Sequence, residues 1–372
     1  MIVLLRAELF TQQNTLALLA IFQHGTEDRH VIITYPVDGK ELNPVIISWL
    51  ESLPLGLQKT IQTVIDYGKE TQLLPDTLRL VVTQDPDGSK INDRGWPHVS
   101  LVDGLRLLRT TLTAILENRF GDRAFLTAIA LPEHKSKLNQ AVKEGWLCFE
   151  SSGGIEQLVK RLKIQTDEAT RPSRERKEAS LAELRWWCLC DRDNSSPTGL
   201  SPNAQSVETA RRKFLPELPY GPLQRRTIEN YLPMQIIQHW AEEPSDAEEK
   251  SLRLQKVQAW EKLPPSLRAR FAMKKGLLWG LSKERKTKLC NAPQMRVNVS
   301  EFTKAFSPAN PDEQNTLREL HKDHSVLRAL QEGFGDQIGS LFAHPRLQES
   351  WVQDEVTHEE RFDLLQSLLA RL

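Results

Sequence analysis

The chain has 372 residues, which is long for one hydrophobic core, so two or three domains are expected. Lysine plus arginine and aspartate plus glutamate each number 49, so net charge excludes a uniformly basic nucleic-acid binder and leaves only a local patch. The four cysteines form no C-x-x-C pair, which argues against structural zinc and a disulfide framework. No apolar run approaches about 18 residues, so we expect no signal peptide, no membrane span and a cytoplasmic location.

Residues 1–120 have the pattern of an N-terminal α/β region. Short β-branched runs predict strands, and apolar residues at helical spacing predict helices. A long helical pattern is expected within 99–118, with Asp103 near its start. The other predicted segments are strands at 31–35 and 78–82, a turn at 84–89, and helices at 43–53 and 57–67.

Residues 121–240 are expected to form a parallel-sheet domain. Three buried-strand runs alternate with helical patterns, and this order implies right-handed crossovers. The runs are Phe125 to Leu131, Trp146 to Phe149 and Trp186 to Cys190, with helices expected up to Glu144 and over 155–162, and a charged connection at 165–180. Residues 241–372 are predicted to form a C-terminal helical region, because apolar residues recur there at spacings of three and four.

The third run, Trp186 to Cys190, leads directly into Asp191 and Asp193. Ligand sites in open α/β sheets lie beyond the carboxyl ends of such strands. Because side chains alternate along a strand, both carboxylates project to one side and repel each other unless a cation lies between them. A hard divalent ion such as Mg²⁺ is the usual solution. The alternative is a solvated strand end with two turn-forming aspartates.

Four features follow one another in the chain: a run ending near Glu133, a strand ending in Gly153-Gly154, the D-x-D of Asp191 and Asp193, and the stretch R-R-T-I-E-N-Y-L-P at 225–233. Together they resemble the Toprim (topoisomerase–primase) domain, in the form found in OLD-family and related bacterial defence nucleases. The resemblance covers about residues 121–280. It implies an α/β fold with a Toprim-like parallel sheet core and a nuclease that uses Mg²⁺ or Mn²⁺ on DNA or RNA, in anti-phage defence.

The first Toprim motif is normally an acidic residue followed by glycine, whereas this place reads L-P-E-H-K. Glu133 is the favoured first acidic ligand, and Asp103 and Glu150 are the alternatives. The chain has no G-x-x-x-x-G-K-[ST] sequence, so an ATPase, if one is needed, would be a separate partner protein. The competing interpretation is a catalytically degenerate Toprim-like subunit that binds nucleic acid or such an ATPase.

Three carboxylates at adjacent strand ends would hold one or two divalent ions for an in-line phosphodiester displacement. Basic residues nearby would neutralise the developing charge or hold backbone phosphates, and their alternatives are ion pairs with the same acids or a solvated helix end. The expected metal ligands are Glu133, Asp191 and Asp193, with Glu229 assisting or capping a helix, Lys274 as the catalytic cation, and Arg225, Arg226 and Lys275 as nucleic-acid-binding residues.

Overall fold

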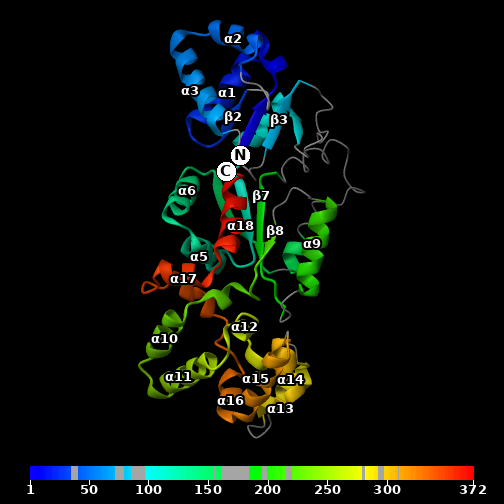
Figure 1. Ribbon diagram of the computed structural model, residues 1–372, viewed down its shortest axis with the longest axis vertical. Coiled ribbons are helices and arrows are strands. Elements are labelled where there is room, and N and C mark those ends of the chain that lie inside the picture. The colour runs from blue at the N-terminus through cyan, green and yellow to red at the C-terminus, as the bar shows by residue number, and fades with distance from the viewer. Residues whose placement is uncertain are drawn as a thin grey trace.

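The computed structural model describes residues 1–34, 41–71, 79–84, 97–154, 156–160, 184–194, 199–214, 220–278, 281–291, 297–308 and 310–372. The molecule is elongated, and three parts follow one another along its long axis (Figure 1). They are an N-terminal α/β unit, a second α/β unit and a helical region. Most of the turn expected at 84–89 and the connection expected at 165–180 lie outside the described residues.

The N-terminal unit is a four-stranded parallel sheet in the order β2-β1-β3-β4. Its strands are β1 (Ile2–Leu5), β2 (Val31–Ile33), β3 (Arg79–Thr83) and β4 (His98–Ser100), and its helices are α1 (Thr15–Thr26), α2 (Pro44–Glu51), α3 (Leu55–Thr71) and α4 (Leu101–Arg109). The strands predicted at 31–35 and 78–82 and the helices predicted at 43–53 and 57–67 are therefore confirmed at these positions. Strands β1 and β4 were not predicted.

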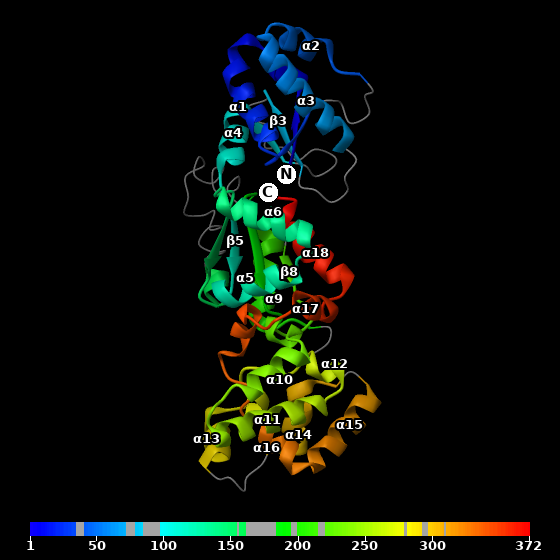
Figure 2. The same cartoon turned by 90° about the vertical axis from the view of Figure 1, so that its left-hand side faces the viewer.

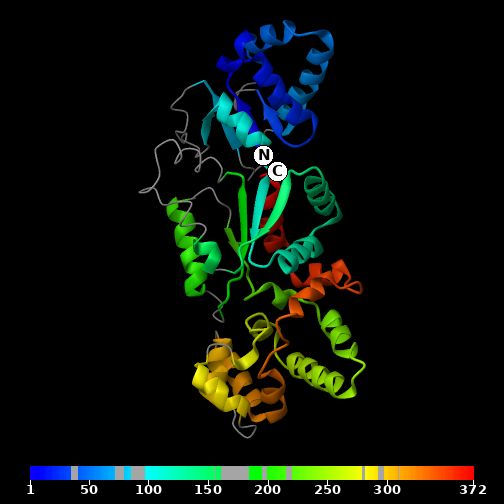
Figure 3. The same ribbon diagram turned by 180° about the vertical axis from the view of Figure 1, so that it is seen from behind.

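The second unit is another four-stranded parallel sheet, in the order β6-β5-β7-β8. Its strands are β5 (Leu112–Leu116), β6 (Leu147–Ser151), β7 (Trp186–Cys190) and β8 (Tyr220–Pro222), and its helices include α5 (Arg119–Ile129), α6 (Pro132–Lys143) and α9 (Pro202–Phe214). Helices α5 and α6 lie on one side of the sheet and α9 on the other (Figure 3).

Strand β7 is buried on both faces, as its continuous apolar run predicts. Trp187 and Leu189 pack into the large core shared with α5 and α6. Cys188 and Cys190 face the opposite way, into a smaller core that contains residues of α9. The α/β class and the parallel sheets expected from the sequence are thus present.

One predicted strand in this unit is wrong, and the predicted helix that precedes the unit is only partly confirmed. The helical pattern expected through 99–118 ends at Arg109, and Leu112–Leu116 forms strand β5. The run from Phe125 to Leu131 is not a strand, because most of it is the end of helix α5. Both runs are short and apolar, and periodicity alone does not separate a buried strand from a buried helix face at this length. The sheet therefore begins before the expected domain boundary at 121.

The helical region contains α10 (Met234–Glu242), α11 (Ala247–Glu261), α12 (Pro265–Arg268), α13 (Lys283–Asn291), α14 (Val299–Phe306), α15 (Pro311–Lys322) and α16 (His324–Leu330). Short 3-10 helices lie at Ala7–Leu9, Gln12–Asn14, Ile228–Tyr231 (η3), Gly276–Leu278 (η4) and Ile338–Ala343 (η5). No described helix is both long enough and apolar enough to span a membrane.

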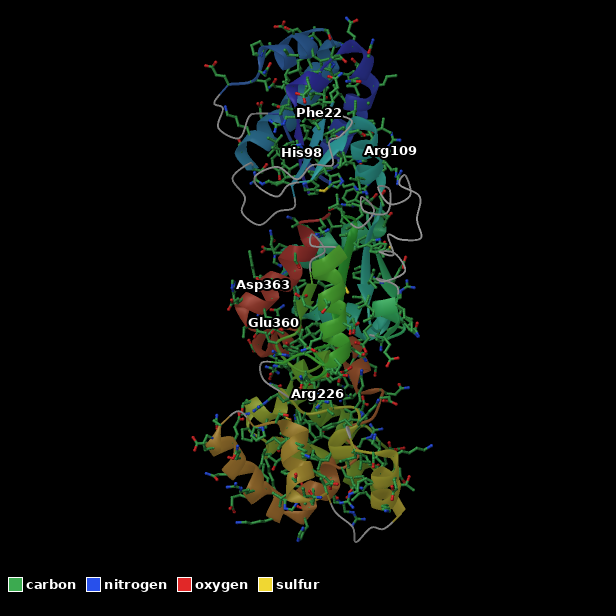
Figure 4. All side chains as sticks on the ribbon, turned by 90° about the vertical axis from the view of Figure 1, so that its right-hand side faces the viewer. Phe22, His98, Arg109, Arg226, Glu360 and Asp363 are labelled. Carbon is green, nitrogen blue, oxygen red and sulfur yellow. The ribbon has the colours of Figure 1, made fainter. Side chains whose placement is uncertain are left out.

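The end of the chain returns from the helical region to the second sheet through α17 (Glu349–Glu355) and α18 (His358–Leu369), as Figure 2 shows. The indole Nε1 of Trp187 donates to Ser367 Oγ at 2.9 Å, which fixes α18 to β7. The buried Glu360, labelled on α18 in Figure 4, accepts hydrogen bonds from the backbone of Gln224 and from the hydroxyl of Tyr231. Part of the range 241–372 thus belongs with the second sheet rather than with the helical region.

Replacing Trp187 by alanine is expected to destabilise the second α/β unit by about 3–5 kcal/mol, since the indole is fully buried and its loss leaves a cavity. Urea denaturation followed by circular dichroism measures this effect. The control is Phe362→Ala on α18, the helix that Trp187 contacts, where the ring is 47% exposed and the change is expected to be small. Equal unfolding midpoints for wild type and Trp187→Ala would contradict the packing described here.

Candidate functional site

The carboxyl ends of β5 and β7 lie side by side and both lead into acidic residues. The register pairs Ile115 with Cys188, and its continuation brings Glu117 next to the start of the Asp191–Asp193 segment. Glu117, Asp191 and Asp193 line one pocket of about 210 Å³. The remaining lining residues are Arg226, Thr227, Ala272, Met273, Lys274, Lys275 and Asp336.

Glu117 occupies the place at the end of the first strand that the sequence analysis gave to Glu133. Its carboxylate accepts a hydrogen bond from the backbone N–H of Asp191, which ties the two strand ends together. Its Oε2 atom is buried and has no hydrogen-bond partner. A buried carboxylate oxygen without a hydrogen-bond donor is unfavourable, so the protein leaves this acceptor unsatisfied.

Glu133 does not lie at a strand end. It lies in the first turn of α6, separated from β5 by the whole of helix α5, and its side chain is 73% exposed. The two alternative first acidic ligands, Asp103 and Glu150, do not line the pocket either. Asp103 lies in the first turn of α4 in the N-terminal unit, bonded to Ser100, and Glu150 lies within β6. The sequence signal that identifies Glu117 is the apolar run LTAIL before it, which resembles a helix as much as a strand.

Backbone contacts with the segment after β8 hold Asp191 and Asp193 in place. The amide of Ile228 donates to Asp191 Oδ1 at 3.2 Å, and the amide of Asp193 donates to the carbonyl of Arg226 at 2.8 Å. Asp193 adopts a left-handed backbone conformation with φ of 45°. Residues other than glycine seldom adopt this conformation, and aspartate is among those that tolerate it best. The strand end is therefore a fixed turn, not a frayed one.

The stretch R-R-T-I-E-N-Y-L-P joins the sheet to the helical region through short 3-10 helix η3. Asn230 closes a capping box with Thr227, and its amide nitrogen donates to the carbonyls of Arg268 and Phe271. Tyr231 contacts Glu360, as described above. The most specific part of the resemblance is thus, in this chain, an architectural junction beside the acidic pocket.

Glu229 lies in the same junction and forms an ion pair with Lys274, with 2.9 Å between Oε1 and Nζ. The carboxylate is only 2% exposed, and its second oxygen has no hydrogen-bond partner. The Cβ that any other residue would place at Gly339 would lie 2.7 Å from Glu229 Oε1, so the glycine leaves room for this carboxylate. Glu229 is therefore brought to the site, where it holds the lysine rather than capping a helix.

The loop that carries Lys274 is clamped against the turn at 333–335. The amide of Phe334 donates to the carbonyl of Met273 at 2.7 Å, and that of Gly335 donates to Lys274 at 3.2 Å. Gly276 and Gly333 both have positive φ, and a Cβ on either would lie within 2.5 Å of the other's backbone. Only glycine allows this close backbone approach.

The other basic residues expected to hold phosphates have different surroundings. Arg225 pairs with Glu355 at 2.8 Å and lies over the ring of Tyr231, so the structure gives it a structural partner. Arg226 is 1% exposed and lies 3.8 Å from Asp193 (Figure 4). Lys275 is exposed and lines the pocket, where it remains available to a ligand.

The pocket gathers more acid than base. Burial, then the charges of Glu117 and Glu229, raise the pKa of Asp191 well above its ordinary value. Burial also raises the pKa of Glu117 and of Asp193, although Lys274 opposes the first shift and Arg226 the second. Burial lowers the pKa of Lys274, but Glu229 outweighs it and the net shift is upward. Burial is the largest cause of the upward shift in all three acids, so these carboxyl groups hold a proton more readily than exposed acids do.

Asp122, on the first turn of α5, adds another buried carboxylate to this group. Burial raises its pKa to about 7, and Glu117 and Glu229 contribute to the rise. Its Oδ2 accepts a hydrogen bond from the amide of Asn118 at 2.8 Å. The sequence analysis did not identify this residue, because its position follows from helix α5, which was not predicted.

Within the described part of the chain, no three His, Cys, Asp or Glu side chains converge as a ready-made metal cage. Mg²⁺ rarely uses such a cage, because it keeps several waters and binds through one or two carboxylates. The unpartnered Oε2 of Glu117 and the unbalanced charge at Asp191 fit a hydrated ion of this kind. The donor set thus suits a hard cation with an incomplete protein shell.

Comparisons with models of protein families, with curated proteins and with solved structures each found no match. The function must therefore be argued from the chemistry of the pocket itself.

Lys274→Met is expected to destabilise the protein by about 3–5 kcal/mol, because it leaves Glu229 buried without its cation. The double variant Lys274→Met/Glu229→Gln is expected to lose less than the single variant, which denaturation midpoints in a double-mutant cycle measure. Lys275→Met, at the exposed neighbour, is the control with little expected effect. Strict additivity of the two single changes would contradict the ion pair.

Asp122→Asn is expected to become more stable than wild type as pH rises. The pKa of Asp122 is about 7 in the folded state, against an ordinary value of 3.8. Between pH 3.8 and pH 7 the unfolded state therefore loses this proton before the folded state does. The free energy of unfolding of the wild type falls over this range, by up to about 4 kcal/mol. Asparagine never ionises and can still accept from Asn118. Melting temperatures between about pH 5 and 8 test this, with the exposed Asp66→Asn as control. A difference in melting temperature between Asp122→Asn and wild type that does not widen with pH would argue against the raised pKa of Asp122.

Proposed function

We propose that the chain is a Mg²⁺- or Mn²⁺-dependent nuclease with a Toprim-like carboxylate centre. The observation that carries this proposal is the meeting of Glu117, at the end of β5, with Asp191 and Asp193, at the end of the neighbouring β7, in one pocket with Lys274. An acid at one strand end and a D-x-D at another are two of the four features on which the resemblance rests. Glu117 takes the place first given to Glu133.

Glu117, Asp191 and Asp193 would hold the ion, which when bound supplies Lewis-acid stabilisation to the oxygens of a phosphodiester. Lys274, fixed by Glu229, presents a permanent positive charge to the same pocket and stabilises negative charge that develops on the phosphate. Lys275 is exposed at the pocket and is suited to hold a neighbouring backbone phosphate. Arg226 acts differently, because it is buried and its guanidinium would orient Asp193 from a distance of 3.8 Å.

The cellular setting proposed here follows from the resemblance and from nothing else. It comprises bacterial anti-phage defence, a cytoplasmic location and cooperation with a separate ATPase subunit. The substrate class, DNA or RNA, likewise follows from the resemblance.

A second candidate is a catalytically degenerate subunit that binds nucleic acid or a partner without cutting. One observation favours it: among the described residues no preformed group of three metal-binding side chains is found, and Lys274 already pairs with one of the acids. In this alternative the lysine would be the permanent counter-charge of the pocket.

The test is cleavage of plasmid DNA, single-stranded DNA and RNA by the pure protein in Mg²⁺, Mn²⁺ or EDTA. We expect metal-dependent cutting that Glu117→Gln and Asp191→Asn each reduce by at least about 100-fold, as for loss of a group that stabilises the transition state. Glu133→Gln is the matched control, because the same chemical change on exposed α6 leaves the pocket intact.

Each outcome separates the candidates. Cutting that persists in the Glu117 and Asp191 variants would place the activity elsewhere. Absence of cutting with every substrate, together with nucleic-acid binding in EDTA, would support the degenerate subunit. Loss of activity in Glu133→Gln, with Glu117→Gln unaffected, would restore the assignment made from the sequence.

A further inference from the structure

Phe120 is the most exposed of the large hydrophobic side chains in the described residues, at 85%. It lies on the first turn of α5, three residues after Glu117. Three residues of chain span at most about 11 Å, so the ring is held near the acidic pocket. An aromatic ring so exposed at this position has no packing role, since it leaves nearly its whole surface in water.

A second pocket, of about 350 Å³, opens beside this ring. Phe120, Ala124, Thr127 and Ala128 line it from one face of α5, as expected for residues three and four apart on a helix. The opposite wall comes from η5 and the residues after it, and includes Phe342 and His344. The small side chains on the helix leave a flat space next to the exposed ring. A pocket of this volume accommodates a small organic group.

Arg123 also lines this pocket, one helical turn from Phe120. No carboxylate pairs with it in the part of the chain that the structure describes. Its guanidinium lies over the ring of Phe149, with 5.3 Å between Cζ and the ring centroid, so its position is constrained. A constrained guanidinium without a carboxylate partner matches a phosphate group well.

We propose that Phe120 and Arg123 form a subsite for an unpaired nucleotide that flanks the scissile phosphate. The nucleobase stacks on Phe120 within the second pocket, and Arg123 holds that nucleotide's phosphate. This inference rests on the proposed nuclease function and specifies its substrate class as single-stranded DNA or RNA. In a duplex both faces of each base are covered by its neighbours, so only an unpaired or terminal base can take this position.

The elements that carry the subsite also carry the acidic pocket, which explains their proximity. Helix α5 begins directly after Glu117, and η5 contains Gly339, which accommodates Glu229. The ring of Phe342 is buried and packs edge-on against Phe125 at a centroid distance of 5.3 Å. Phe342, in the wall opposite Phe120, is therefore packed against the same helix α5 that carries Phe120.

The experiment is binding in EDTA, which removes cleavage from the measurement. A single-stranded DNA of about 15 nucleotides with one 2-aminopurine is the probe, followed by fluorescence anisotropy and by quenching of the 2-aminopurine. Phe120→Ala is expected to weaken binding by about 5- to 100-fold and to abolish the quenching, whereas Phe120→Trp retains both. Phe362→Ala, another exposed phenylalanine, is the control without effect. Arg123→Ala is expected to lower the salt dependence of log K by about one unit.

The outcomes are distinguishable from those of the cleavage test. Quenching that depends on Phe120 in a protein that never cuts would support the subsite and overturn the nuclease. Cutting that is unaffected by Phe120→Ala, with unchanged binding, would overturn the subsite and leave the nuclease standing. No binding of single strands by wild type, or an equal loss on a fully paired duplex with closed ends, would also overturn the subsite.

Discussion

Repulsion between carboxylates is the constraint on which the arrangement around the second sheet depends. Parallel strands end at one edge of a sheet, so the topology β6-β5-β7-β8 brings Glu117 and the Asp191–Asp193 segment together whether or not their charges are compatible. Burial then raises the free energy of ionising them, as the pKa of Asp191 shows. Lys274, the cation that reaches Glu229, comes from the helical region rather than from the sheet. The ion pair between Lys274 and Glu229 thus joins the second α/β unit to the helical region, in addition to apolar packing.

The junction at 225–233 holds these parts of the chain in fixed positions through its side-chain contacts. Glu229 binds Lys274, Asn230 holds the backbone near Arg268 and Phe271, and Tyr231 contacts Glu360 on the returning helix α18. These three side chains therefore contact three different parts of the chain. The residues of this stretch thus hold the second sheet, the helical region and α18 together. The stretch lies beside the acidic pocket because these three parts meet at the strand ends.

The sequence predicted the parts of this site that depend on local pattern. Strand β7 was predicted at its observed residues because its apolar run has strand length and is bounded by polar residues, and Asp191 and Asp193 followed from it. Strand β5 and helix α5 were not predicted, because LTAIL and FLTAIAL are similar short apolar runs whose conformation is decided by what they pack against. Because the second of these runs was predicted as the strand in place of the first, the sequence analysis chose Glu133 instead of Glu117 as the acidic residue at the strand end. The pairing of Lys274 with Glu229 joins residues far apart in the chain, so no local pattern contains it.

The carboxylates of the pocket differ in whether an internal cation lies next to them. Lys274 contacts Glu229, and Arg226 lies 3.8 Å from Asp193, so each of these cations already has an acidic partner. Glu117 and Asp191 retain raised pKa values despite both cations, and Glu117 keeps a buried oxygen without a donor. Buried unbalanced charge lowers stability, so the folded chain neutralises Glu117 and Asp191 either by protonating them or by binding a cation at the two neighbouring strand ends. The metal-dependent nuclease proposed above relies on the second route, in which a divalent ion would supply the positive charge.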